Sequence, residues 1–319
     1  MQRWRMATAI AAMMLISPSS HAAPPESGTP YLSVAQLRGL YDDPAGHIAV
    51  IEGMEVYYKD EGKGPAILMV HGSRSSLRQW DDVAAKLTDR YRVIRYDIPA
   101  AGLSGTVTDA QAAAVQPTDI AEKLLAQLGV DHITFVGVSS GGTLGMYLAA
   151  KRPDLVDRLI MANTPADPVK TDHLKPTPSW AQALQRAADT KFEDQDYWKE
   201  YLTFFSGDGR RIGPAKIKAY YDLNRRNPEK HMIALVAKIG DGKAAKVAMA
   251  QVKAPTLLIW GGADPLLTPP AANALERYLT GTQVSKIFMP DVGHYPPLEA
   301  PERFAQIVAA YIEAATPAP

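Results

Sequence analysis

The amino-acid sequence predicts an α/β fold in which a mostly parallel central sheet carries helices on both faces and an inserted helical cap. Apolar runs typical of strands alternate along the chain with amphipathic helical patterns, as expected where helices connect parallel strands. Several runs are continuously apolar, which is typical of strands buried on both faces. Residues 166–252 interrupt this alternation of strands and helices, because they contain helical patterns but no convincing strand. The chain has 319 residues, 46% of them hydrophobic, which is enough for such a core.

The strand-like segments follow one another along the core. The first two, HIAVIEG and MEVYYKDEG, alternate apolar and polar residues on either side of Gly53, which predicts a hairpin. The later segments are more continuously apolar and predict parallel strands; they are PAILMVHG, YRVIRYDIP, HITFVGVS, DRLIMANTP, APTLLIWGGADP and the weaker VSKIFMPDVGH.

Amphipathic patterns fill the intervals between these segments. LRQWDDVAAKLTDR, PTDIAEKLLAQLG, GTLGMYLAAKRP and PERFAQIVAAYIEAA predict helices. In the second of these, Pro117 fits the first turn and Gly129 ends the helix. We expect residues 30–165 and 253–319 to form the α/β core. Residues 166–252 are expected to form the cap, with helices in PSWAQALQRAADT, FEDQDYWKEYLTFF and PAKIKAYYDLNRR.

Residues 1–22 have the three-part pattern of a secretory signal peptide. The basic start MQRWRM precedes the apolar run ATAIAAMMLI, which is too short to span a bilayer. Small residues follow, with Ser20 and Ala22 at suitable positions for cleavage after Ala22. We therefore expect a periplasmic or secreted protein; an amphipathic or frayed N-terminus is the alternative.

Charge and cysteine content narrow the classes of function. Lys plus Arg equals Asp plus Glu, 34 each, which argues against a general affinity for nucleic acid or for an anionic membrane surface. The absence of cysteine excludes disulfides, a cysteine nucleophile and a thiolate metal site. We expect no nucleic-acid partner and no stable membrane insertion, and the sequence leaves the oligomeric state open.

A turn rich in serine and glycine separates a predicted strand from a predicted helix. Gly137-Val138-Ser139-Ser140-Gly141 matches G-x-S-x-G, which is weak evidence alone but stronger between a strand and a helix. In that setting the central serine is held in a strained turn with its hydroxyl exposed. Ser139 is therefore the candidate nucleophile, and Ser140 contributes its backbone N–H. The alternative is a glycine-rich helix N-terminus that binds phosphate.

A serine nucleophile needs a base, and the base needs an acid to orient it. His294 lies in the loop between the last predicted strand and the last predicted helix, from which it could reach Ser139. His71 ends an apolar strand and is expected to be structural. Asp264 follows a buried strand in WGGADP and is the candidate acid. Asp167, just past the preceding strand, is the competing acid.

Acyl transfer also needs N–H donors for the negative charge that develops on the carbonyl oxygen. We expect one donor at the backbone of Ser140 and the other in the loop after MVHG, at Ser73 or Arg74. The Arg74 side chain is a candidate for binding a substrate carboxylate, or it caps the loop in solvent. Asp97, after the next strand, is expected to support the loop that contains His71.

Taken together, these motifs resemble those of α/β-hydrolase-fold serine hydrolases with a helical cap. DEGKGPAILMVHGS, YDIPAAGLSG, GVSSGG, WGGADP and GHYPPLEAPERF carry the resemblance, which covers residues 48–315. It implies the α/β-hydrolase fold and a triad of Ser139, Asp264 and His294. One departure is Ala100-Ala101, where such proteins more often have a glycine and a charged or aromatic residue.

The resemblance implies cleavage of a small-molecule ester or related acyl substrate through an acyl-enzyme, with no metal or organic cofactor. Serine at position 139 argues against haloalkane dehalogenases and epoxide hydrolases, which use an aspartate nucleophile. Aminopeptidase-like or carbon–carbon bond hydrolysis on the same triad remains an alternative, as does a non-catalytic binding protein with this fold. The candidates for lining a pocket, or for packing the cap, are its aromatic residues Trp180, Tyr197, Trp198, Phe204, Phe205, Tyr220 and Tyr221.

Overall fold

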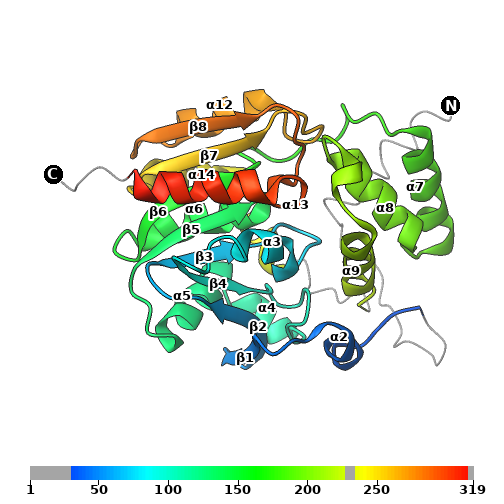
Figure 1. Cartoon of the computed structure of the whole chain (residues 1–319), viewed down its shortest axis with the longest axis horizontal. Coiled ribbons are helices and arrows are strands. Elements are labelled where there is room, and N and C mark those ends of the chain that lie inside the picture. Colours follow the sequence, from blue (N-terminus) through cyan, green and yellow to red (C-terminus); the bar gives the residue numbers. More distant parts are fainter. Residues whose placement is uncertain (1–29, 227–233, 315–319) are drawn as a thin grey trace.

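The computed structural model describes residues 30–226 and 234–314, and the predicted signal peptide lies outside them. Its centre is an eight-stranded sheet with the order β1-β2-β4-β3-β5-β6-β7-β8 (Figure 1). β1 and β2 form an antiparallel hairpin and β2 pairs antiparallel with β4, whereas all other neighbours are parallel. The strands are β1 (Gly46–Ile51), β2 (Met54–Glu61), β3 (Ala66–Val70), β4 (Arg92–Tyr96), β5 (Ile133–Val138), β6 (Val156–Ala162), β7 (Thr256–Gly261) and β8 (Val284–Met289). The predicted α/β fold is confirmed.

Burial along the strands explains why the apolar pattern is stronger in some of them than in others. Every residue of the central strands β5 and β7 is buried, which accounts for their continuous apolar runs. β8 lies at the edge of the sheet, and Ile287 and Phe288 remain partly exposed there. An edge strand has one side in solvent, so its apolar pattern is weaker.

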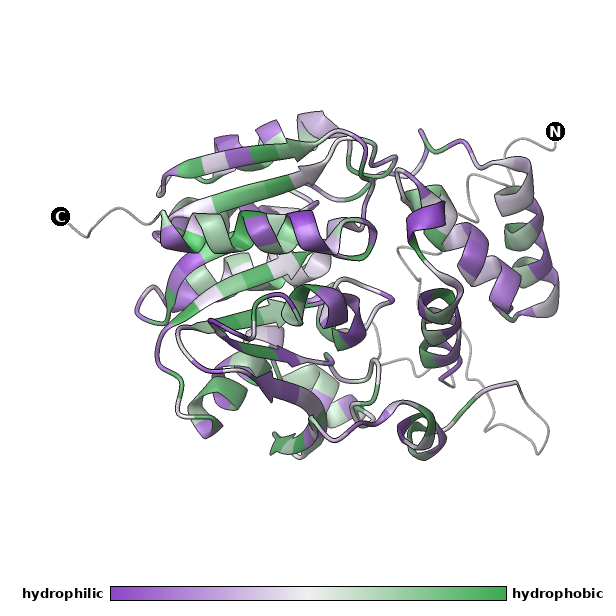
Figure 2. Cartoon of the chain, viewed as in Figure 1, coloured by the Kyte–Doolittle hydropathy of each residue, from purple (hydrophilic) through white to green (hydrophobic). Residues whose placement is uncertain are grey.

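Helices cover both faces of the sheet. α3 (Asp81–Ala84) and α14 (Pro301–Glu313) pack together over one face, where Trp80 contacts Phe304. α5 (Pro117–Gln127), α6 (Ser140–Lys151) and α12 (Pro269–Tyr278) contribute to the core on the other face. Figure 2 shows hydrophobic colour in the central strands and both colours along α14, as expected of an amphipathic helix. Shorter helices are α4 (Asp109–Ala114) and α13 (Pro296–Glu299).

Of two helices predicted from the sequence, one begins and ends where its local signals place it, and the other is shorter than its pattern predicts. In α5, Pro117 occupies the first turn, the Asp119 carboxylate accepts the Gln116 N–H, and Gly129 has a positive φ of 64°. The helix expected from LRQWDDVAAKLTDR is shorter than predicted, because a 3-10 turn at Leu77–Trp80 leads into only four residues of α3. After α3 the backbone continues in turns, in which the Leu87 N–H donates to the Ala84 carbonyl three residues earlier, and Leu87 is still buried.

The described residues of the insertion between β6 and β7 form helices joined by loops, with no named strand. α7 (Pro178–Thr190), α8 (Gln195–Phe205) and α9 (Pro214–Asn224) pack in sequence as a layer beside the sheet (Figure 1). The three helices match the helical segments predicted for the cap. α10 (Ala234–Ala237) and α11 (Gly242–Gln251) follow, and α11 packs on α6 and α12. The last part of residues 166–252 therefore lies on the core.

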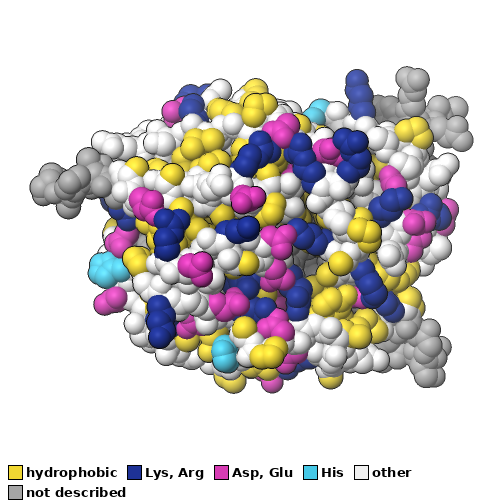
Figure 3. Space-filling view, in the orientation of Figure 1, with side chains coloured by type: hydrophobic (Ala, Val, Ile, Leu, Met, Phe, Trp, Pro, Cys, Tyr) yellow, Lys and Arg dark blue, Asp and Glu magenta, His cyan; other side chains and the backbone are white. Residues whose placement is uncertain are grey.

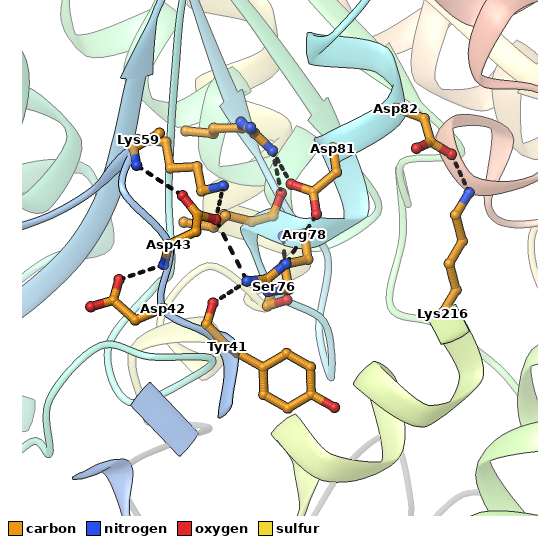
Figure 4. Close-up of polar contacts among 12 residues, drawn as sticks. Tyr41, Asp42, Asp43, Lys59, Ser76, Arg78, Asp81, Asp82 and Lys216 are labelled. Atoms are coloured by element: carbon orange, nitrogen blue, oxygen red, sulfur yellow. Dashed lines mark hydrogen bonds and ion pairs between the residues drawn. The ribbon is translucent and has the colours of Figure 1, made fainter. Parts of the chain in front are cut away.

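The segment before β1 contacts both core and cap. α2 (Val34–Tyr41) buries Leu37, and the Tyr41 hydroxyl donates to Asp222 of α9 over 2.6 Å. Just beyond α2, Asp43 pairs with Lys59 of β2 (Figure 4). None of the helices in the described ranges is long and apolar enough to cross a membrane.

Candidate active site

Ser139 occupies the sharp turn between β5 and α6. Its φ of 54° and ψ of −126° are unfavourable for a residue with a side chain, whereas Ser140 already begins the helix. Its backbone N–H donates to Ala162 of β6 over 2.9 Å, which joins the turn to the sheet. Residue 137 has no room for a side chain, because a β-carbon on Gly137 would lie 2.5 Å from the carbonyl carbon of Gly141. The two adjacent serines thus differ in backbone conformation as the motif predicts.

His294 lies between β8 and α13, and Asp264 follows β7. The imidazole Nδ1 is 2.7 Å from Asp264 Oδ2, and both side chains are buried. Because β5, β7 and β8 run in the same direction, the residues that follow them lie at one edge of the sheet with Ser139. In the described part of the chain the Ser139 hydroxyl makes no hydrogen bond to His294. Such bonds are often long before substrate binds, so the placement remains compatible with catalysis.

The Asp264 carboxylate is held by two donors besides the imidazole. Asn163 Nδ2 donates to Oδ2 over 2.7 Å, and the Leu266 N–H donates to Oδ1 over 2.8 Å. The competing acid, Asp167, instead contacts Lys246 and the Tyr278 hydroxyl near the surface. Of the two acids left open by the sequence, Asp264 is therefore the one that contacts His294.

The loop after β3 lies directly against the serine turn. A β-carbon on Gly72 would be 3.2 Å from that of Ser139, and the Ser73 hydroxyl donates to the Ser140 hydroxyl over 2.9 Å. Within the described ranges the Ser73 backbone N–H meets no protein acceptor. The Ser140 N–H lies at the first residue of α6, where helix geometry provides no partner. Both predicted donors are thus placed beside Ser139 with N–H groups available.

His71 has a structural environment that differs from that of His294. It is 2% exposed, Nδ1 donates to the Gly72 carbonyl over 2.7 Å, and Nε2 accepts the Ile98 N–H over 3.0 Å. This arrangement requires a neutral ring, and burial lowers the pKa of His71 to about 4. Asp97 accepts the Leu77 N–H and a second backbone N–H, and burial raises its pKa to about 6. Both contacts fit the supporting roles predicted for these residues.

Arg74 points from the same loop into the cap. Its guanidinium pairs with Glu193 and lies 4.7 Å from the Trp198 ring centroid. Tyr197 and Tyr201 are also within cation–π range of it. The structure thus places Arg74 in a paired, aromatic environment, and substrate binding by this residue stays a prediction.

Aromatic side chains of the cap pack mainly on one another. Trp180, Tyr197 and Trp198 are almost fully buried within this layer. Phe205 comes closest to the site, with its ring centroid 6.4 Å from that of His294. Tyr201, which the sequence did not single out, accepts a hydrogen bond from the Tyr295 hydroxyl over 2.9 Å.

Glu299 is a buried residue whose role was not evident from the sequence. Its carboxylate accepts the N–H of Gly293, beside His294, over 2.9 Å. It also accepts the N–H groups of Gly207 and Asp208, which directly follow α8. Burial raises the pKa of Glu299 above its ordinary value. The only sequence signal was an acid in the otherwise apolar stretch PPLEAP.

Among the described residues, no group of histidine, aspartate and glutamate side chains is placed to hold a metal ion. Figure 3 shows basic and acidic side chains interspersed over one face of the molecule.

Comparison with known proteins agrees with the architecture. The model of a family described as alpha/beta hydrolase fold matches residues 65–301. A pimeloyl-[acyl-carrier protein] methyl ester esterase of Nitrosomonas europaea is 25% identical, covering 78% of this chain and 96% of its own. Haloalkane dehalogenase 2 of Mycobacterium bovis is 26% identical, covering 79% and 90%. The crystal structure of a putative lipase from Acinetobacter baumannii superposes with a TM-score of 0.68 at 21% identity, covering 88% and 94%.

Proposed function

Because the chain belongs to the alpha/beta hydrolase fold family, we propose that it is a serine hydrolase that cleaves a small ester or a related acyl compound. The chain is a hydrolase of this fold, with esterase- and lipase-like homologues. The observation that supports the serine mechanism most strongly is the buried Asp264–His294 pair at the sheet edge that also carries the strained Ser139. The dehalogenase relative does not change this proposal, because residue 139 is serine.

In the proposed reaction, His294 Nε2 takes the proton from Ser139 Oγ while that oxygen attacks the substrate carbonyl carbon. The resulting oxyanion accepts hydrogen bonds from the N–H groups of Ser73 and Ser140. When the tetrahedral intermediate collapses, the leaving oxygen takes the proton from His294 and departs as an alcohol. The acyl group remains on Ser139 as an ester.

Water completes the proposed cycle. His294 takes a proton from the water as its oxygen attacks the acyl-enzyme carbonyl, and the second tetrahedral intermediate again places its oxyanion on the two N–H groups. Collapse returns the proton to Ser139 and releases the carboxylic acid. Asp264 keeps the imidazole in one orientation and stabilises the imidazolium that forms in each half-reaction.

An aminoacyl amide is the second candidate substrate. It is favoured by polar groups where the cap meets the core, namely the Arg74–Glu193 pair and the hydroxyl of Tyr201, which accepts from Tyr295 beside His294. Comparing kcat/KM for p-nitrophenyl esters with that for aminoacyl p-nitroanilides distinguishes the two. A higher value for the anilides would replace the ester proposal with the peptidase-like one.

The adjacent serines provide the direct test of the proposed mechanism. Ser139→Ala should reduce hydrolysis of a p-nitrophenyl ester by about 10⁶-fold, or to background, because the triad acts as a unit. Ser140→Ala should retain activity within about tenfold, because its backbone N–H survives the substitution. Loss of activity in Ser140→Ala with retention in Ser139→Ala would contradict the assignment.

Export is part of the same proposal. The basic, apolar and small-residue pattern of residues 1–22 supports cleavage after Ala22 and a periplasmic or secreted product. N-terminal sequencing of the protein recovered from the periplasm or medium should begin at Ala23. Recovery of only the uncleaved chain from the cytoplasm would contradict this.

A further inference from the structure

Three cap residues converge on the two residues that follow Ser73. Glu193 pairs with the Arg74 side chain, Asn224 Nδ2 donates to the Arg74 carbonyl over 3.1 Å, and the Tyr220 hydroxyl lies 2.7 Å from Ser75 Oγ. We infer that these loop–cap contacts hold the Ser73 N–H in the position needed to stabilise the oxyanion. The inference rests on the proposed serine-hydrolase function and makes Arg74 a positioning residue.

The backbone at Arg74 explains why the loop requires such support. Its φ is 62°, in the left-handed region that residues with a β-carbon avoid. Asn224 binds the carbonyl of this same residue. A left-handed residue persists only when its surroundings over-determine it. Without the cap contacts, the backbone after Ser73 would be free to relax and rotate that N–H away from the oxyanion.

The side chain of Arg74 supplies the second half of the support. Its guanidinium lies over the rings of Trp198, Tyr197 and Tyr201 at 4.7, 5.7 and 5.4 Å from their centroids. All three rings belong to α8, and Glu193 lies just before this helix. Because cation–π contacts and a charge pair act together on one group, displacement of α8 would move Arg74 and with it the loop.

The opposite side of the loop is held by the core. The Gly72 carbonyl accepts from His71, and the Gly72 N–H donates to Gln79 over 3.2 Å. The core therefore fixes the residue before Ser73, while the cap fixes the two residues after it. The oxyanion donor lies between these two sets of contacts, so its orientation depends on both.

A second cap–core ion pair provides a matched control. Lys216 of α9 lies one helical turn before Tyr220 and pairs with Asp82 of α3 near the surface (Figure 4). Lys216→Gln removes this cap–core charge contact and leaves the side chains of Glu193, Tyr220 and Asn224 that contact the loop unchanged. Any effect shared with this variant reflects general loosening of the cap.

The test compares Arg74→Ala, Glu193→Gln and Lys216→Gln in ester hydrolysis and in binding of a trifluoromethyl ketone. The ketone forms a hemiketal with the nucleophile, so its affinity reports on the oxyanion site. Arg74→Ala should lower kcat and ketone affinity in parallel by about tenfold or more, since loss of a whole oxyanion donor costs about 10²–10³. KM should change little. Glu193→Gln should show a smaller effect of the same kind, and Lys216→Gln should match the wild type.

The variants were chosen so that folding defects do not obscure the result. Alanine keeps the β-carbon of residue 74, so Arg74→Ala removes the guanidinium and leaves the backbone strain at φ 62° as it is in the wild type. Should it fail to fold, Glu193→Gln decides the question by the same measurements. An active wild type whose folded variants match Lys216→Gln, or change only in KM, would overturn this inference alone. A wild type that neither hydrolyses esters nor binds the ketone would overturn the proposed function as well.

Discussion

Acidification should destabilise the wild-type protein through His71 in a way that His71→Asn removes. The buried ring is neutral in the folded protein, with a pKa of about 4, and titrates near 6.5 when unfolded. Between these values the unfolded state binds the extra proton, so the free energy of unfolding falls as the pH falls from 6.5 to 4. The difference of about 2.5 between these pKa values corresponds to about 3.5 kcal/mol at about 1.4 kcal/mol per pH unit, of which about 3 kcal/mol is lost by pH 4.

The assay is urea unfolding of both proteins at pH 7 and pH 4, followed by circular dichroism. His71→Asn should be the less stable protein at pH 7, because it disturbs the hydrogen bonds to Gly72 and Ile98. Its deficit should shrink by up to about 3 kcal/mol at pH 4. Asp97 also titrates in this range, but it is present in both proteins, so the comparison cancels most of its contribution.

A second histidine gives the control. His132 is exposed beside Asp157, and the hydrogen bond between them raises the pKa of His132. His132→Asn should therefore show no recovery relative to the wild type on acidification. A deficit of His71→Asn that stays constant from pH 7 to pH 4 would refute the buried, neutral role of His71.

Two further predictions concern stability. Glu299→Gln replaces a carboxylate that accepts three backbone N–H groups, so it should lower the free energy of unfolding by about 1–3 kcal/mol and reduce kcat for ester hydrolysis. Glu302→Gln, at an exposed residue, should change the free energy of unfolding by no more than about 0.5 kcal/mol in the same assays. Equal behaviour of the two variants would contradict the positioning of the His294 loop by Glu299. Gly145→Ala places a β-carbon 2.2 Å from the Phe135 ring and should lower the free energy of unfolding by about 1–3 kcal/mol. In Gly39→Ala the new β-carbon meets nothing within 4 Å, and alanine favours the helix α2, so the free energy of unfolding should rise by up to about 1 kcal/mol. Denaturation midpoints that move in the opposite directions would contradict the packing described.

Features encoded in short stretches could be predicted from the sequence. The strands were recognisable because their burial leaves continuous apolar runs, and the Ser139 turn because its glycines lie within five residues. Ser139, Asp264 and His294 could be singled out because each follows a strand that the sequence predicts, namely β5, β7 and β8. Where local pattern and tertiary packing disagreed, as in the helix that ends at α3, the prediction was wrong in length.

Contacts between distant segments could not be predicted. Glu299 accepts from residues more than 90 positions away, and Arg74 meets Glu193 across 119 positions. Asn163, which steadies Asp264, lies in a strand-end sequence with no local signal of its partner 101 positions later. Such pairs depend on how the cap and the strand ends meet in space. The sequence therefore indicated which groups are chemically reactive, but not which groups position them.

The most direct test of the central claim is labelling by a fluorophosphonate, with the modified residue located by tandem mass spectrometry. The wild type should carry one adduct on Ser139 Oγ, and His294→Ala should react far more slowly, because the hydroxyl is a poor nucleophile without its base. An adduct on Ser140, or no labelling under conditions that label a control esterase, would contradict the assignment of Ser139 as the nucleophile.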